Sequence, residues 1–259
     1  MALIKTSEEI EILKQGGKIL SDTLRELRTK CVPGVSTKEL DDLAQRRFKE
    51  AGGEPSFLNY RISDDDPGFP GAVCTSINEE VVHGIPMPDR FVQEGDIVSL
   101  DIGLWYKGLC TDMATTVIVG EVSQEVRDLV TRTRQGLVEG LSVIRAGGVV
   151  GDIGKAIQTY LEPFGYGIVR DLVGHGVGHG VHEEPPVPNY HEPRGPRVEL
   201  KTGMVLAIEP MITLGGWRVE QLDDGWTIAT KDGSLCAHSE VTVVVTEKGY
   251  ELITPWPDA

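Results

Sequence analysis

Acidic and imidazole side chains stand inside apolar, strand-like segments of this sequence, and this feature restricts the fold more than any other. The segments DIVSLDIGLW, CTDMATTVIV, GHGVGHGVH, VLAIEPMI and HSEVTVVV carry Asp101, Asp112, His175, Glu209 and Glu240. A buried charge without a partner costs several kcal/mol or more. The fold must therefore gather these side chains around something that cancels their charge, and a metal is the simplest candidate.

The first two acids are predicted to share a hairpin. DIVSLDIGLW and LCTDMATTVIV read as strands joined by a tight turn at residues 106–108. If Trp105 lies opposite Gly108, an antiparallel register also puts Asp101 opposite Asp112. Opposed Cβ atoms are about 4.5–5.5 Å apart, where like charges repel. We therefore expect the hairpin to form half of a cation site, in a register that a single bulge would shift.

The other three residues are expected to complete the site. His175 and Glu209 would fill the shell of one metal, and Glu240, like Asp112, is placed to bridge to a second. Four carboxylates carry a charge of about −4, which suits two divalent ions that share and activate a hydroxide. Oxygen ligands with one imidazole favour Mn, Fe, Co or Zn. These residues predict a hydrolase centre with two divalent ions.

The histidines of GHGVGHGVH leave a second kind of metal site open, a helical zinc site of the HExxH type. Glycines at positions 174, 176, 178 and 180 oppose the helix that such a site needs. We therefore expect a non-helical segment in which His175 is a ligand and His182 faces the substrate. His179 is expected to have a non-catalytic role.

Composition excludes several classes of protein. The chain has 259 residues, with 25 Lys and Arg against 40 Asp and Glu, and a net charge of −15. This balance argues against nucleic-acid binding, which needs a basic face. Residues 1–17 are charged and contain no apolar run, so we expect neither a signal peptide nor a membrane span. The four cysteines have no CxxC spacing. A cytoplasmic protein is expected.

Capping residues and apolar periodicity predict four helices. They run from Thr6 to about Leu27, from Ser36 to Ala51, from Val122 to Arg145, and up to Gly165. Residues 147–153 weakly echo residues 34–40, which indicates two similar halves of about 1–120 and 121–259 within a single domain. Ligands from both halves would then meet at the shared seam.

The chain resembles the type I methionine aminopeptidases. SINEEVVHGIP, GDIVSLDIG, GHGVGHGVHEEP, IEPM and DGWT appear in that family's order, and the resemblance extends over nearly the whole chain. The chain resembles the short bacterial form, because it shows neither an N-terminal zinc-finger extension nor the long insertion of the type II enzymes. The resemblance implies the pseudo-twofold pita-bread fold, an α+β fold in which helices pack on one face of an antiparallel sheet.

The resemblance also implies roles for further residues. His83 would hydrogen-bond the scissile amide nitrogen, His182 would support the developing oxyanion, and Glu209 would be both ligand and proton shuttle. The implied methionine pocket consists of Phe57, Tyr60, Phe69, Cys74, Val181 and Trp226, together with His83 and His182. From the residues alone, Phe57, Phe69 and Trp226 could equally be core.

Some positions depart from the family's pattern. Val181 replaces a larger aromatic residue, so we expect somewhat larger first residues to be accepted, and RISDDDP after Tyr60 resembles an insertion. His238 and Val241 replace the more usual Gln and His beside Glu240. These changes affect the pocket's outer shape and the groups around the ligands.

The expected function is removal of the initiator methionine from nascent proteins with a small second residue, by a metal-bridged hydroxide. Nascent N-termini would be the partners of a monomer that binds neither DNA nor membrane, and a ribosome contact stays open. Two alternatives remain: a proline-directed aminopeptidase of the same fold, which should carry a long N-terminal domain, and a non-catalytic pita-bread binding protein, which should lack ligands.

Overall fold

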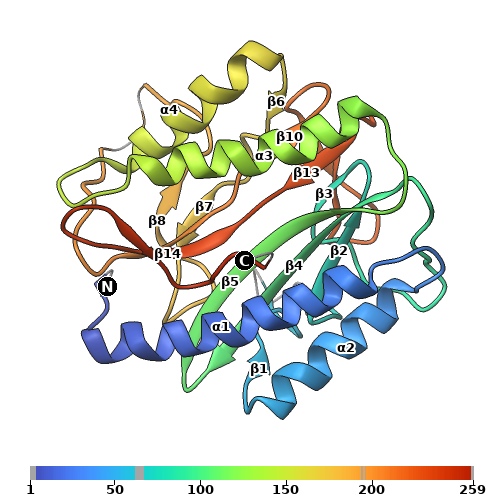
Figure 1. Cartoon of the computed structure of the whole chain (residues 1–259), viewed down its shortest axis with the longest axis horizontal. Coiled ribbons are helices and arrows are strands. Elements are labelled where there is room, and N and C mark those ends of the chain that lie inside the picture. The colour runs from blue at the N-terminus through green and yellow to red at the C-terminus, as the bar shows by residue number, and fades with distance from the viewer. Residues whose placement is uncertain (1–3, 62–66, 194, 196, 258–259) are drawn as a thin grey trace.

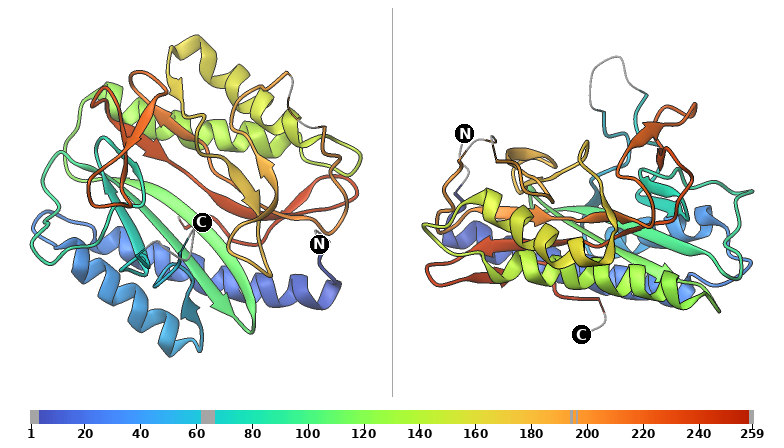
Figure 2. Two further views of the ribbon diagram at one scale, coloured as in Figure 1. Left: turned by 180° about the vertical axis from the view of Figure 1, so that it is seen from behind. Right: turned by 90° about the horizontal axis from the view of Figure 1, so that it is seen from above.

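The computed structural model describes residues 4–61, 67–193, 195 and 197–257. Helices cover one face of a set of antiparallel sheets, and long loops rise from the opposite face (Figures 1 and 2). Within the described residues, no helix combines the length and the apolar character that crossing a bilayer requires.

Capping residues start the helices at the predicted places. Thr6 caps α1 (Ser7–Lys30) and Ser36 caps α2 (Thr37–Glu50), each in a capping box with the glutamate at N3. The second pair comprises α3 (Gln124–Ser142), α4 (Val150–Leu161) and a short 3-10 turn, Glu162–Phe164. In each pair the second helix follows an isolated bridge, formed by Ser36 before α2 and by Val149 before α4. The two segments that echo each other in sequence, 34–40 and 147–153, thus have this local feature in common.

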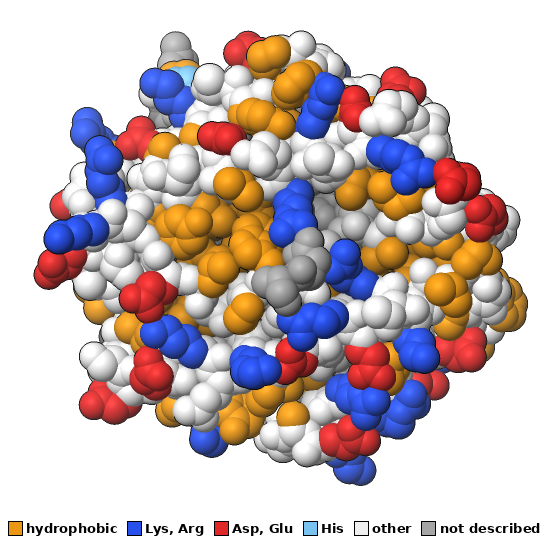
Figure 3. Space-filling view, in the orientation of Figure 1, with side chains coloured by type: hydrophobic (Ala, Val, Ile, Leu, Met, Phe, Trp, Pro, Cys, Tyr) orange, Lys and Arg blue, Asp and Glu red, His pale blue; other side chains and the backbone are white. Residues whose placement is uncertain are grey.

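The long helices are amphipathic, which places the core between them and the sheets. Leu20, Leu24 and Leu27 of α1 are fully buried in the main core cluster. Figure 3 shows charged side chains of both signs on the solvent side of this helix layer. On α1, Asp22 accepts hydrogen bonds from Lys18 and Arg25.

In the part of the chain that the structure describes, the strands form four sheets, and every strand pair is antiparallel. The first sheet contains β1 (Glu54–Pro55), β2 (Val73–Ile77), β4 (Ile97–Tyr106) and β5 (Leu109–Ile118). The five-stranded sheet contains β7 (Gly174–Gly176), β8 (Glu183–Val187), β9 (Val205–Ile208), β14 (Val241–Val245) and β15 (Tyr250–Leu252). One three-stranded sheet contains β3 (Glu80–Val82), β11 (Val219–Gln221) and β12 (Ile228–Thr230). The other contains β6 (Gly167–Ile168), β10 (Met211–Thr213) and β13 (Cys236–His238). The predicted α+β class with antiparallel strands is confirmed.

Polar contacts join the two halves along β5. The Thr242 hydroxyl accepts from the Asp112 amide at 3.1 Å and donates to the Asp112 carbonyl at 2.7 Å. The Glu240 amide donates to the Ala114 carbonyl at 2.9 Å. The seam thus places Asp112 of the first half beside Glu240 of the second, as predicted.

The predicted register of the β4–β5 hairpin was wrong. Asp101 lies opposite Ala114, and Asp112 lies opposite Gly103. The turn is shorter than expected because Lys107 adopts a left-handed conformation with φ of 50°, so that Lys107 and Gly108 alone close the hairpin. The shift is two residues, and side chains alternate between faces, so both acids still lie on one face as diagonal neighbours.

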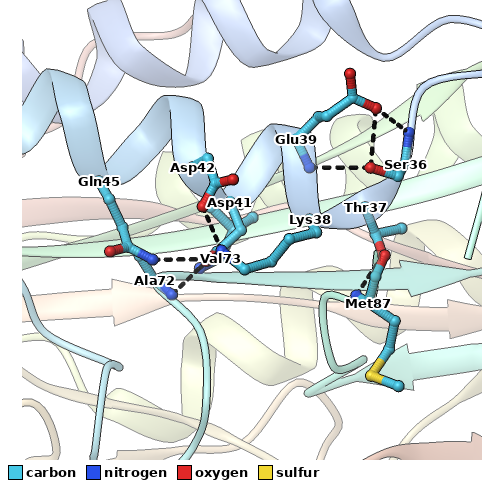
Figure 4. Close-up of polar contacts among 10 residues, drawn as sticks. All are labelled: Ser36, Thr37, Lys38, Glu39, Asp41, Asp42, Gln45, Ala72, Val73 and Met87. Atoms are coloured by element: carbon cyan, nitrogen blue, oxygen red, sulfur yellow. Dashed lines mark hydrogen bonds and ion pairs between the residues drawn. The ribbon is translucent and has the colours of Figure 1, made fainter. Parts of the chain in front are cut away.

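A buried carboxylate anchors α2 to the strand that faces Asp101. Asp41 is fully buried and accepts hydrogen bonds from the amides of Ala72 at 2.5 Å and Val73 at 3.2 Å (Figure 4). Gln45 donates to its other oxygen at 2.8 Å. This anchor holds the start of β2, in which Cys74 pairs with Asp101.

Candidate metal centre

The five predicted ligands line one pocket. They come from β4, β5, β7, the end of β9 and the start of β14, so both halves contribute. One ligand atom each from Asp112, His175 and Glu240 lies within 4.8 Å of the others. His175 Nε2 lies 3.4 Å from Glu209 Oε1. The structure therefore brings together all five residues that the sequence singled out.

Breaks in the strands turn two of these ligands inward. Glu209 directly follows β9 and precedes Pro210, and Glu240 lies in the gap between β13 and β14. His175 sits in β7 beside Gly174, where a Cβ atom would be 2.4 Å from the Ala207 carbonyl oxygen. Only glycine allows β7 to approach β9 this closely. The glycines therefore serve strand packing around a ligand, and the segment is not a helix.

The carboxylates are held in an environment that disfavours their charge. Burial raises the pKa of Asp112 to about 7. Burial, and then the charge of Asp112, raises the pKa of Asp101 and of Glu240 well above the usual range. Burial also raises that of Glu209. Without a cation, these groups therefore bind protons at a pH at which carboxyl groups are normally ionised.

The chemistry of the donor atoms fits a divalent metal ion. Asp101 Oδ1 and Glu240 Oε1 are buried and have no hydrogen-bond partner among the described residues. His175 donates a hydrogen bond from Nδ1 to the Gly176 carbonyl at 2.9 Å. The lone pair of Nε2 is then available to coordinate a metal ion. Burial, and then His182, lowers the pKa of His175 to about 4, so the ring is neutral. Orphaned carboxylate oxygens beside a neutral imidazole are the ligands that such ions prefer.

His238 is buried beside this cluster. Its Nε2 is 3.6 Å from Glu209 Oε2, and both ring nitrogens are buried without a hydrogen-bond partner among the described residues. Burial, and then His83, lowers its pKa to about 3. His238 is one of the positions that depart from the pattern of the family that the chain resembles, and in the structure it approaches the candidate ligand Glu209. Val241, the second departure, is buried in β14.

An apolar slot opens directly onto the ligands. Phe69 and Trp226 meet edge to face with ring centroids 5.4 Å apart, and Trp226 Nε1 donates to the Pro67 carbonyl at 3.1 Å. The predicted residues Phe57, Tyr60, Phe69, Cys74 and Trp226 line the pocket, as do Val82, Leu172, Val173 and Met211, which were not predicted.

Val181 occupies a different place from the other predicted slot residues. It is buried in the same apolar cluster as Phe57 and Trp226 but does not form part of the lining. Its effect on the size of the accepted first residue therefore stays a prediction. Of the RISDDDP insertion, residues 62–66 lie outside the described residues.

Of the three further histidines that the sequence singled out, two line the pocket. His83 has a left-handed backbone with φ of 60°, and burial, followed by His182, lowers its pKa to about 4. The His182 Nδ1 atom lies 2.6 Å from the Tyr60 hydroxyl, and its ring centroid is 4.5 Å from that of His175. His179 is not in the lining, and its Nε2 lies 2.6 Å from Glu9 Oε1 on α1.

The metal-free protein should lose stability as the pH rises from about 6.5 to 8. The pKa of Asp112 is about 7 in the folded state and about 3.9 when unfolded, so the folded state holds more protons in this window. The free energy of unfolding then falls as the pH rises. Below about pH 6.5 the buried histidines, whose pKa values are lowered, have the opposite effect.

Thermal unfolding in the presence of a chelator, measured across this range, checks the sign. Asp112→Asn should flatten the pH dependence, and Mn²⁺ should raise the Tm of the native sequence most at pH 8, where the ligands are deprotonated. A metal-free Tm that rises from pH 6.5 to 8 would contradict this interpretation.

Comparison with known proteins agrees with the geometry of the site. Residues 11–247 match the model of metallopeptidase family M24. A methionine aminopeptidase of Clostridium acetobutylicum is 46% identical over 98% of this chain and 99% of its own length.

Solved structures extend the comparison to the fold. The crystal structure of a methionine aminopeptidase from Thermotoga maritima has a TM-score of 0.92 and 45% identity, and the match covers 97% of this chain and 98% of that one. An Xaa-Pro dipeptidase from Bacillus anthracis has a TM-score of 0.76 at 25% identity, and this chain covers 62% of it. The predicted resemblance and its pita-bread fold are confirmed, and the chain belongs to metallopeptidase family M24.

Proposed function

We propose that this chain is a methionine aminopeptidase that removes the initiator methionine from nascent proteins with a small second residue. One observation carries the proposal: an apolar slot and the five metal-ligand candidates share a single pocket. A substrate whose first side chain fills the slot would present its α-amino group and first peptide bond to the ligands. The closer similarity to methionine aminopeptidases than to an Xaa-Pro dipeptidase favours methionine over a proline-directed substrate.

The slot suits an unbranched thioether. Phe57, Phe69 and Trp226 supply aromatic surface, and Cys74 supplies a soft, small group. Methionine sulfur makes favourable contacts with aromatic rings, and its flexible chain fills irregular space. The free α-amino group would lie toward the carboxylates, so the site would accept only chain ends.

The five ligands would hold two divalent ions, with Asp112 and Glu240 shared between them. Co, Mn, Fe and Zn all suit oxygen donors with one imidazole. When bound, such ions lower the pKa of water and polarise a carbonyl as Lewis acids. The buried, unpartnered oxygens of Asp101 and Glu240 support this arrangement.

Three side chains would handle protons and charge. Glu209 would take the proton of the attacking water and pass it to the leaving amine, the general acid–base role of a carboxylate. His83 would hydrogen-bond the scissile nitrogen, and His182 would donate to the carbonyl oxygen as negative charge develops there. Burial lowers the pKa of both imidazoles, so each is neutral near pH 7.

Tyr60 would set the tautomer of His182. Its hydroxyl lies 2.6 Å from His182 Nδ1 and donates to that nitrogen when the ring proton is on Nε2. Nε2 then remains as the donor for the substrate oxygen. Tyr60 would thus serve the reaction as well as the slot.

The proposed setting is the cytoplasm, where a monomer with a single catalytic domain would act on nascent N-termini. The main core cluster supports one domain, since it contains residues of both halves, from Leu20 to Val245. A contact with the ribosome stays open.

Kinetics on X-Ala-Ser and Met-X-Ser peptides test the function. Met at the first position should be cleaved. Norleucine, which has a methylene in place of the methionine sulfur, should be tolerated, since an apolar pocket discriminates a difference of one methylene by only about 1–3 kcal/mol. Gly, Ala or Ser at the second position should be accepted, and Leu or Lys refused. Comparable rates for Met, Lys and Pro at the first position would refute the methionine assignment while leaving a metallopeptidase.

Tyr60→Phe should lower kcat on Met-Ala-Ser roughly tenfold and leave KM almost unchanged. The variant keeps the aromatic wall but removes the hydroxyl that orients His182, so the loss falls on the transition state. Tyr160→Phe, on α4 and outside the pocket, is the matched control. A rise in KM with unchanged kcat would show that Tyr60 acts only as part of the slot.

A further inference from the structure

His182 lies on a loop that has few bonds of its own. We define the His182 loop as residues 177–182, between β7 and β8. Its one internal backbone hydrogen bond among the described contacts runs from the Gly178 amide to the Gly180 carbonyl at 3.1 Å. Because glycines lose more conformational freedom on ordering than other residues, this loop needs support from outside. Two backbone hydrogen bonds hold the start of the loop, from the Cys110 amide to the Gly178 carbonyl at 2.7 Å and from the Val177 amide to the Val205 carbonyl at 3.2 Å.

Glu183 supplies support from the residue next to His182. Its Oε1 accepts from the amides of His179 at 2.5 Å and Gly180 at 2.8 Å. Its Oε2 accepts from Lys5 Nζ at 2.6 Å. One carboxylate thus ties two loop amides to the N-terminal segment, and hydrogen bonds to an ionised group are stronger than neutral ones.

Lys5 is buried to an unusual degree for a lysine. Its side chain is 1% exposed, against 16% for Glu183. It passes directly over Gly178, where a Cβ atom would lie 2.3 Å from Lys5 Cε. The Lys5 amide donates to the Gly203 carbonyl at 2.8 Å, which fixes the segment beside the sheet.

A second charged contact joins the same two elements. Glu9, in the first turn of α1, places Oε1 2.6 Å from His179 Nε2. Its Oε2 accepts from the Thr6 amide in the capping box. The cap of α1 and the His182 loop therefore form one network.

A buried ion pair is weak evidence for stability, since apolar residues of similar volume often stabilise as well. What the pair does supply is a fixed geometry for the loop beside it. We infer that Lys5 and Glu183 are positioning residues that hold the His182 loop so that His182 meets the substrate carbonyl. The inference rests on the proposed function, and it assigns the N-terminal segment a part in catalysis.

Lys5→Met tests this inference, because it removes the charge and keeps most of the alkyl chain. Hydrogen exchange of residues 177–183 should become faster, and kcat on Met-Ala-Ser should fall roughly tenfold or more with KM within about twofold, since small misplacements of catalytic groups cost rate. Lys14→Met is the matched control: Lys14, on α1, pairs with Glu11 of the same helix and with Glu251 of β15, and its replacement should change neither quantity.

A double-mutant cycle separates positioning from general stability. In a His182→Ala background, Lys5→Met should cause no further loss of kcat. An equal loss in both backgrounds, or loop exchange that does not change, would overturn the inference. If Lys5→Met does not fold, the double variant Lys5→Met with Glu183→Gln removes both buried charges and is tested in the same cycle, with the same results expected.

The two proposals fail in different ways. If the native sequence does not cleave Met-Ala-Ser, the proposed function fails, whatever the exchange experiment shows. If the native sequence is active and Lys5→Met loosens the loop without lowering kcat, only the positioning role is wrong.

Discussion

Four carboxylates are buried around one imidazole where the two halves of the chain meet, and their mutual repulsion is the constraint on which the rest of the structure depends. Removing each charge from water is costly, and bringing like charges together adds to that cost. The raised pKa values of Asp101, Glu209 and Glu240 express both effects, and that of Asp112 expresses burial. Protons can relieve the repulsion, but divalent cations do so while leaving the ligands ionised.

The architecture around the ligands follows from this constraint. The Thr242 hydroxyl holds β14 against β5 through both the amide and the carbonyl of Asp112, so the seam is fixed at the ligand itself. Asp41 anchors the strand that faces Asp101. The loops on the other face then add an apolar slot and two neutral histidines, His83 and His182.

Local patterns predicted much of this structure from sequence. Capping boxes at Thr6 and Ser36 located two helices, and acids in apolar strands pointed to the candidate metal centre, because each of these signals is contained in a few neighbouring residues. The hairpin register was predicted wrongly because it depends on the left-handed conformation of Lys107. A lysine rarely adopts this conformation, so nothing in the sequence indicated it. The contact of Tyr60 with His182 and that of Lys5 with Glu183 span more than a hundred residues, so no local pattern could predict them.

Metal reconstitution tests the central claim most directly. The protein is stripped with a chelator and titrated with Mn²⁺ or Co²⁺, while bound metal and turnover of Met-Ala-Ser are measured together. The account predicts no turnover without metal, and activity that rises with occupancy of the site. Asp112→Ala and Glu240→Ala should each lose the second ion and most of the activity. Full turnover by metal-free protein, or two ions and full activity in either variant, would contradict it.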